Sequence, residues 1–251
     1  MNNDINKYLF GNVDIHNIDF DFIKNSINNS IREKKKISIT YANSYSIVRC
    51  RKNLDLLNAF NNSDLVFPDG TGIYLASKIL YRNENFKRFN WTDCSYDFLK
   101  ICEENKWKIF FLGASKEILN GAVRNIKNKY PSLLLTGAFN GYEDIERADL
   151  IDKINESDSD ILWVGMGTPK QELWIDKFKE NINVPVIQSC GGLFNYFAGK
   201  LVRGPLVFRK LGLEWIFRVI VHPKSYFRRY IIGIPIFIYI IIKQFLKINP
   251  D

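Results

Sequence analysis

The chain has 251 residues, of which 46% are apolar and 25% charged, and this composition predicts a folded globular protein with one large core. The formal net charge is +8, and the segment 201–251 holds nine lysines and arginines against two acidic residues. Such a basic segment suits phosphate groups, either of lipid head groups or of a diphosphate substrate. Nucleic acid is disfavoured as a partner because no helix-turn-helix, RNA-binding or zinc-finger pattern accompanies the charge.

The cysteines and the N-terminus predict a cytoplasmic protein. Four cysteines are widely spaced without a C-x-x-C pair, and the first residues lack the basic start and apolar run of a signal peptide. The two histidines, His16 and His222, are far apart in the sequence, which disfavours a histidine-based metal site or a Ser-His-Asp triad. We expect neither a metal nor a cofactor.

Short apolar runs alternate with longer amphipathic stretches along the chain. The runs predict buried strands at 37–40, 64–67, 108–113, 133–137, 160–167 and 184–190. The stretches predict helices at about 44–62, 71–82, 92–106, 115–130, 143–156, 169–181 and 206–221. This alternation predicts an α/β fold, a Rossmann-like parallel sheet with helices on both faces. We expect a catalytic core at 1–200 and a helical, membrane-associating appendage at 201–251.

In such a sheet, ligands bind at the carboxyl ends of the strands, so the loops that follow the strands are the candidate sites. Asp69 follows the run 64–67 and is itself followed by Gly70 and Gly72. A carboxylate in this place can accept a proton from a hydroxyl nucleophile. The competing interpretation is that Asp69 only caps a helix that begins near Thr71.

Two further strand-to-helix turns contain glycine. After the run 160–167, Thr168 as N-cap, Pro169 at the first helical position and Gln171 form a predicted capping box. The same helix start can bind an anion, so capping and phosphate binding can coexist. The missing third glycine argues against a dinucleotide fingerprint. Gly113 lies in the other turn, FLGAS.

Two polar segments receive opposite interpretations. SDSD at 157–160 resembles the D-x-D that binds manganese in many sugar transferases, but it precedes its strand and is interpreted as a solvated turn at the opposite edge of the sheet. Asn195 lies in GGLFNYFAGK after the last strand, where glycines permit close approach of a ligand. An ordinary tight loop over the core is the alternative for that segment.

The C-terminal segment combines cations with aromatic and aliphatic residues. Residues 203–230 interleave basic and aromatic side chains, which suits a membrane interface, although a buried helix with a basic rim is the alternative. Residues 231–242 are wholly apolar but shorter than the ~20 residues that span a bilayer. We expect Gly233 and Pro235 to interrupt this run, and Lys243 and Lys247 to meet head groups.

Four blocks of the sequence resemble the WecG/TagA/CpsF family of bacterial glycosyltransferases, glycosyltransferase family 26. They are LVFPDGTGI, DILWVGMGTPKQELWI, GGLFNYFAGKLVRGP and LGLEWIFRVIVHPKSYFRRY, and the resemblance extends from about residue 8 to residue 230. It implies an inverting, metal-independent transfer of a sugar, N-acetylmannosamine-like or another hexose. The implied donor is a uridine diphosphate (UDP) sugar and the implied acceptor a saccharide on undecaprenyl diphosphate, in bacterial cell-surface polysaccharide synthesis.

The resemblance also implies roles for individual residues. It makes Asp69 the catalytic base and implies a peripheral enzyme on the inner face of the cell membrane, in contact with anionic lipid, as a monomer or a homo-oligomer. Together with Gly113, the substrate-binding residues are Thr40, Asn43, Arg88, Asp93, Gln171 and Asn195. The residues that hold the diphosphate are Arg203, Arg218 and Arg228, and the tail is expected to complete the site when it folds onto the core.

The chain departs from the family pattern at four positions. TYAN places Thr40 one residue further from Asn43 than the family's T-x-N does. Trp91 replaces a glycine in RFNWTD, where it would crowd a sugar pocket. Asn195 replaces an aspartate, and Ser225 stands where many members have arginine.

Two other function classes are open at this point. One is a catalytically silent nucleotide- or lipid-binding scaffold of a glycan assembly complex, and the presence of Asp69, Gln171 and the tail arginines favours an enzyme over it. The other is a nucleotide-sugar epimerase or dehydrogenase, which the absent dinucleotide fingerprint disfavours.

Overall fold

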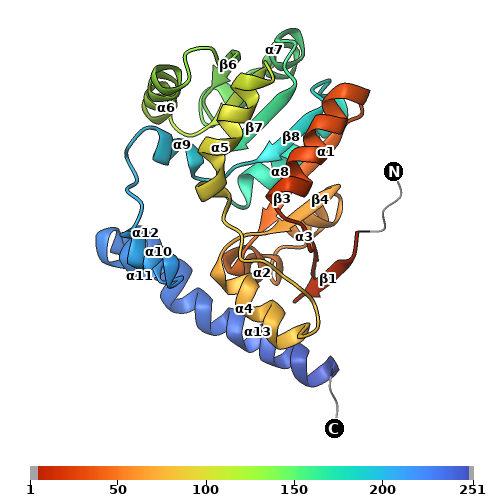
Figure 1. The fold of residues 1–251 in the computed structure, drawn as a ribbon, viewed down its shortest axis with the longest axis vertical. Coiled ribbons are helices and arrows are strands. Elements are labelled where there is room, and N and C mark those ends of the chain that lie inside the picture. The colour runs from red at the N-terminus through yellow and green to blue at the C-terminus, as the bar shows by residue number, and fades with distance from the viewer. Residues whose placement is uncertain (1–4, 249–251) are drawn as a thin grey trace.

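The computed structural model describes residues 5–248 and has one six-stranded sheet in which all strands are parallel (Figure 1). The strand order is β4-β3-β8-β7-β5-β6. The strands are β3 Ile37–Ala42, β4 Leu65–Pro68, β5 Ile109–Gly113, β6 Leu135–Phe139, β7 Ile161–Gly165 and β8 Val186–Ser189. The predicted fold class is confirmed, and every predicted apolar run overlaps one of these strands.

Helices cover both faces of the sheet, because successive strand residues point to opposite faces and both faces are apolar. Phe111 and Trp163 stack on one face, with ring centroids 5.8 Å apart. Phe110 and Leu162 pack on the other. The first face carries α1 Phe20–Glu33, α5 Trp91–Glu104, α6 Lys116–Lys129 and α9 Leu193–Phe197. The second carries α2 Ser44–Cys50, α3 Leu54–Asn61, α4 Thr71–Leu80, α7 Leu150–Glu156 and α8 Lys170–Phe178.

An N-terminal hairpin, which was not predicted, packs beside the edge strand β4. It consists of β1 Lys7–Phe10 and β2 Val13–His16. The Nδ1 atom of His16 accepts a hydrogen bond from the backbone N–H of Val66 at 2.9 Å. Burial lowers the pKa of His16, which favours the neutral imidazole that this bond requires.

Two of the predicted helices are each divided in two. Asn53 accepts from the backbone N–H of Leu56 at 2.9 Å, so it ends the first part of the predicted helix 44–62 and caps α3. Gly212, with a φ of 76°, separates α10 Leu206–Lys210 from α11 Glu214–Val221. Glycine adopts this left-handed backbone without steric cost, which explains the break.

The C-terminal helix is longer than the sequence predicted. It consists of α12 Pro223–Phe227, a π-helical turn Arg228–Ile232 and α13 Gly233–Ile248. The combined helix Pro223–Ile248 is, by length and composition, long and apolar enough to cross a membrane. The expected interruption at Gly233 and Pro235 is therefore wrong. Pro235 has no backbone N–H to donate to the preceding turn of the helix. That preceding turn is the wide π-helical turn Arg228–Ile232, and the helix continues through the proline.

Helix α13 lies along the outside of the core, beside α2 and α4 (Figure 1). Phe237 and Ile241 are buried against these helices, and the side chain of Gln244 donates to the carbonyl of Leu9 at 2.7 Å. Only 17% of the most apolar window of the helix is buried. One side of α13 thus belongs to the core, and most of its surface is exposed.

Candidate active site

The loops that follow β3, β4, β7 and β8 bring several of the predicted residues to the same edge of the sheet. Asn43 follows β3, Asp69 follows β4, Gln171 lies at the start of α8 after β7, and Gly191 follows β8. Because the four strands are parallel neighbours in the sheet, their carboxyl ends open into one crevice.

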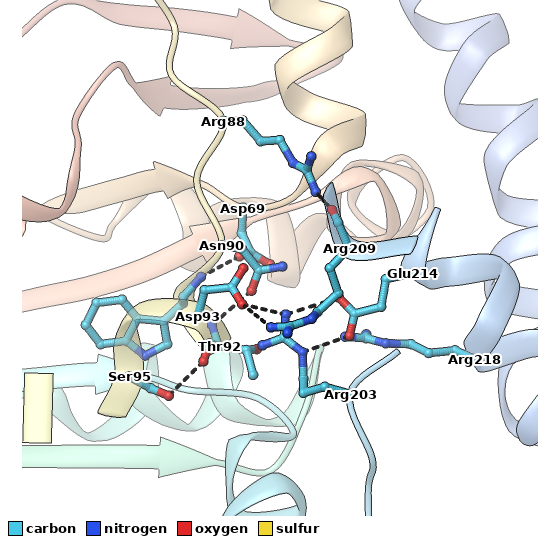
Figure 2. Close-up of polar contacts among 11 residues, drawn as sticks. Asp69, Arg88, Asn90, Thr92, Asp93, Ser95, Arg203, Arg209, Glu214 and Arg218 are labelled. Carbon is cyan, nitrogen blue, oxygen red and sulfur yellow. Dashed lines mark hydrogen bonds and ion pairs between the residues drawn. The ribbon is translucent and has the colours of Figure 1, made fainter. Parts of the chain in front are cut away.

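Asp69 is held by the start of a different helix from the one expected. Its Oδ1 accepts from the backbone N–H of Trp91, the first residue of α5, at 3.0 Å (Figure 2). Helix α4 begins after Gly70 without a side-chain cap, so the interpretation of Asp69 as the cap of that helix is wrong. Burial raises the pKa of Asp69, and the Trp91 N–H, Arg218 and Arg229 partly oppose this increase. A raised pKa improves a carboxylate as a general base near neutral pH.

Asn43 links the ends of β3 and β4. Its Oδ1 caps α2 by accepting from the backbone N–H of Ser46 at 3.1 Å. The Asn43 side chain also interacts with Asp69 and favours the charged carboxylate. The predicted substrate-binding residue thus lies directly beside the predicted base.

Gln171 ties two strand ends together through its side-chain amide. Its Oε1 accepts from the backbone N–H groups of Gly167 at 3.1 Å and Gly191 at 2.9 Å. Its Nε2 donates to Glu172 at 2.8 Å and to the Tyr41 hydroxyl at 3.4 Å. The predicted capping box is therefore wrong: the Gln171 side chain bonds neighbouring loops, and the Gly167 N–H that could have bound an anion is already satisfied.

The remaining parts of the predicted capping box have other partners. Pro169 occupies the N-cap position of α8, and the Thr168 hydroxyl donates to Oε1 of Glu172 at 2.9 Å. Glu172 is 3% exposed, and its Oε2 has no hydrogen-bond partner among the described residues. Burial raises the pKa of Glu172, while Gln171 and Thr168 oppose the increase.

Tyr41 is a site residue that the sequence analysis did not identify. Its hydroxyl approaches Gly191 so closely that a Cβ at that glycine would collide with it. Burial raises the pKa of Tyr41, and the carboxylates of Glu172 and Asp69 add to the increase. The period of two in a strand could have revealed it, because Tyr41 lies two residues before Asn43.

Thr40 lies inside the sheet. Its exposed fraction is 2%, and its hydroxyl is 2.8 Å from that of Ser189 on β8. Its side chain points to the face opposite that of Tyr41. The expected contact with substrate stays a prediction for Thr40, whereas the structure gives its hydroxyl a partner within the protein.

Two of the predicted tail arginines, Arg203 and Arg218, share Glu214 within the tail, and Arg203 also reaches Asp93 of the core (Figure 2). Arg203 donates to Glu214 at 2.9 Å and to Asp93 at 2.7 Å, and Arg218 donates to Glu214 at 3.0 Å. Burial alone would raise the pKa of Glu214, but Arg218 and Arg203 together lower it. Asp93 thus contacts the tail, which is docked on the core in this structure.

Arg88 also binds the tail. Its guanidinium donates to the backbone carbonyls of Lys210, at 2.7 Å, and of Arg209 at the end of α10 (Figure 2). A positive charge at the C-terminus of a helix is favourable because the last carbonyls are otherwise unsatisfied. A cavity of about 370 Å³ lies at this junction, with Arg88, Asp93 and Leu206 in its lining.

Arg229, which was not predicted, is half-buried, whereas the predicted Arg228 is exposed. The charge of Arg229 acts on both Asp69 and Tyr41. Its guanidinium lies 4.8 Å from the ring centroid of Tyr45, and its buried Nε has no hydrogen-bond partner among the described residues. Arg218, whose charge also acts on Asp69, likewise has a buried Nε without a partner among the described residues, so two tail arginines near the base have unused donor capacity.

The last two predicted residues lie at the end of β5 and in the helix that follows β8. Gly113 has a φ of 142°, and a Cβ there would collide with the carbonyl of Gly165, so the ends of β5 and β7 require glycine at this point. Asn195 lies on α9 and donates to the carbonyl of Gly192 at 3.4 Å.

Two other expectations can be compared with the structure. Trp91 is 3% exposed and packs in the core against Phe98 and Trp163, so the expectation that it crowds a sugar pocket is wrong. Asp158 pairs with Lys108 at the amino-terminal edge of the sheet, where the SDSD segment was expected to form a solvated turn. In the part of the chain whose side chains are described, no three His, Cys, Asp or Glu side chains are grouped to hold a metal ion.

Known proteins are similar to this chain in sequence. The family described as "Glycosyl transferase WecG/TagA/CpsF family" matches residues 8–250. The chain is 34% identical over 193 residues to the N-acetylglucosaminyldiphosphoundecaprenol N-acetyl-beta-D-mannosaminyltransferase of Staphylococcus aureus strain NCTC 8325, across 77% of this chain and 74% of the relative. The relatives of the same name from strains COL and MW2 match with the same identity and the same coverage.

Proposed function

The chain belongs to the WecG/TagA/CpsF family of glycosyltransferases, and on that premise we propose that it transfers a sugar from a UDP-sugar to a sugar carried on a polyprenyl diphosphate. The name of the S. aureus relatives supports the acceptor, since it specifies a sugar on diphosphoundecaprenol. The donor is supported by the cations around the strand-end crevice, which suit a diphosphate. The product belongs to a bacterial surface polysaccharide.

Asp69 is the general base of this reaction. It takes the proton of the acceptor hydroxyl while that oxygen attacks the anomeric carbon, and the bond from this carbon to the diphosphate breaks. The observation that carries the assignment is a carboxylate at the end of a sheet strand with its pKa raised by burial, next to Asn43 and in the field of two arginines.

The diphosphate leaves with additional negative charge, which cations in the crevice stabilise. Arg229 has a buried Nε without a partner, and Arg218 is held in place by Glu214 and by the Tyr230 hydroxyl at 3.3 Å. We assign these two arginines to the diphosphate. Arg203 and Arg88 keep the tail docked on the core, and Arg228 remains available to lipid or to the polyprenyl diphosphate.

The enzyme works as a peripheral protein on the cytoplasmic face of the membrane. The helix Pro223–Ile248 exposes Ile238, Ile242 and Leu246. Its other side packs on the core, so a position along the membrane surface is compatible with the fold, whereas a spanning position would separate Phe237 and Ile241 from their partners.

The substitution Asp69→Asn tests the proposal. It removes the base but keeps the size of the side chain and its acceptor for the Trp91 N–H, so acceptor-dependent release of UDP should fall by roughly 10²–10⁴-fold with little change in binding of the UDP-sugar. Asp64→Asn, at the opposite end of β4, is the matched control and should keep its turnover. Turnover near that of the wild type in Asp69→Asn contradicts the role of the base.

A further inference from the structure

A second basic cavity lies at the far end of α13, away from Asp69. Its volume is about 360 Å³, and it is enclosed by the β1–β2 turn, the end of α2 and the last turns of α13. The lining includes Asn12, Ile47, Arg51, Tyr239, Lys243 and Lys247. None of these residues takes part in the strand-end crevice.

The charge of this cavity is unbalanced. Arg51, Lys243 and Lys247 line it, and no aspartate or glutamate does. Among the side chains that the structure describes, no carboxylate forms an ion pair with any of the three cations. The Arg51 guanidinium lies 5.8 Å from the ring centroid of Tyr239, which holds it at the rim. An anion is therefore the ligand whose charge complements the cavity.

The walls of the cavity are fixed in place by hydrogen bonds. The Gln244 side chain accepts from the backbone N–H of Gly11 at 2.8 Å and donates to the carbonyl of Leu9 at 2.7 Å. These two bonds attach α13 to the hairpin. Ile240 packs on the same side, close to Gly11. The lysines thus project from a helix whose position is already set.

An exposed apolar stripe borders the lysines on the same helix. Ile238, Ile242 and Leu246 are four residues apart, so they lie above one another, and they are 50%, 50% and 63% exposed. At about 100° per residue, Lys243 and Lys247 lie between this stripe and the side that packs on the core. A surface that contacts lipid chains along the stripe would therefore bring lipid phosphates to the lysines.

We propose that this cavity binds the phosphate of an anionic lipid head group, with Arg51, Lys243 and Lys247 as its ligands and the apolar stripe in the acyl boundary. The proposal rests on the membrane location given under the proposed function, but not on the transfer reaction. The adjoining stripe favours a lipid over a free phosphate ion, because a soluble anion would use the cations alone.

Vesicle binding by the full chain tests this site. The vesicles contain phosphatidylcholine either alone or mixed with phosphatidylglycerol, and the variants are Arg51→Ala, Lys243→Ala and, as the matched control, Lys52→Ala. Lys52 carries the same charge next to Arg51 but lies outside the cavity. Each cavity variant should bind the mixed vesicles more than fivefold more weakly, because it loses a direct phosphate contact in addition to the ~1 kcal/mol that any cation near the surface contributes, and Lys52→Ala should lose at most about fivefold.

Three outcomes overturn the proposal. The first is an equal loss of binding in Arg51→Ala and Lys52→Ala, which indicates diffuse attraction, and the second is equal binding of the wild type to both kinds of vesicle. The third is displacement of the protein from mixed vesicles by glycerol phosphate at the same concentration as the lipid. Transfer to a short-chain soluble acceptor is measured in parallel. The cavity variants should keep this activity, and its absence in the wild type would contradict the proposed reaction without affecting the lipid site.

Discussion

The strand-end crevice and the docked tail form the two parts of the proposed active site, and different interactions keep each part in place. In the crevice, Gln171 connects Gly167, Gly191 and Tyr41 through buried hydrogen bonds. At the tail, Glu214 shares its carboxylate with two arginines. Buried bonds of the first kind respond little to salt, whereas partly exposed ion pairs are screened. We therefore expect the crevice part of the site to keep its structure at any salt concentration, and the docking of the tail to depend on ionic strength.

The largest effect should follow from breaking the crevice part of the site. Gln171→Leu leaves the N–H groups of Gly167 and Gly191 without an acceptor, which costs roughly 1–3 kcal/mol each, so the free energy of unfolding should fall by about 4 kcal/mol. Urea unfolding measures it. The change should be the same at low and high salt, and a strong salt dependence would contradict the comparison.

Glu172→Gln is the matched control for Gln171→Leu because it keeps an acceptor for the side chains of Gln171 and Thr168.

The same variant tests a pH dependence of stability. Burial raises the pKa of Glu172 in the folded state, so the folded protein retains a proton that the unfolded chain releases. Stability should therefore decline as pH rises from the ordinary glutamate range to the raised pKa, and Glu172→Gln should remove this decline.

A smaller effect, confined to the tail, should follow from Glu214→Gln. The variant leaves Arg203 and Arg218 without the carboxylate that they share inside the tail, so Arg203 is no longer held in position to reach Asp93 of the core, and the docked tail should be destabilised by about 3 kcal/mol. Limited proteolysis should cut within 201–222 faster than in the wild type while the core stays protected. Glu117→Gln, in an exposed pair with Lys200, is the control and should not change the digestion.

The smallest effect concerns the pH dependence of activity. Asn43→Ser keeps a cap for α2 but is too short to reach Asp69, so the pKa of Asp69 should rise further. Activity of a general base falls as pH drops through its pKa, and the acid limb of kcat/KM should therefore move to higher pH. An unchanged limb contradicts either the contact or the role of Asp69 as the base.

Much of the fold could be predicted from the sequence, because buried parallel strands are continuous apolar runs. The β1–β2 hairpin was missed because strands of four residues are too short to show a period. Helix α1 was missed as well, although Asp19 accepts from the Phe22 N–H and gives a cap signal at its start.

The residues of the site were predicted less completely than the fold. Asp69 and Gln171 lie in motifs, but the bond from Gln171 to Gly191 joins residues 20 apart in the sequence, and local patterns do not reveal it. Arg228 was predicted, whereas it is the charge of Arg229 that acts on Asp69. Both residues begin the π-helical turn Arg228–Ile232, whose side-chain directions the 3.6-residue period of an α-helix does not predict.

The helix from Pro223 to Ile248 sets the distance between the two phosphate-binding regions proposed for this protein. Arg229 and Lys243 lie fourteen residues apart on it, which corresponds to about 21 Å along an α-helix. Because the helix lies along the membrane surface in the proposed orientation, its length fixes how far the reacting sugar lies from the bound lipid phosphates along that surface. Inserting one residue between them would turn Lys243 by about 100° out of its cavity, with the composition of the tail almost unchanged.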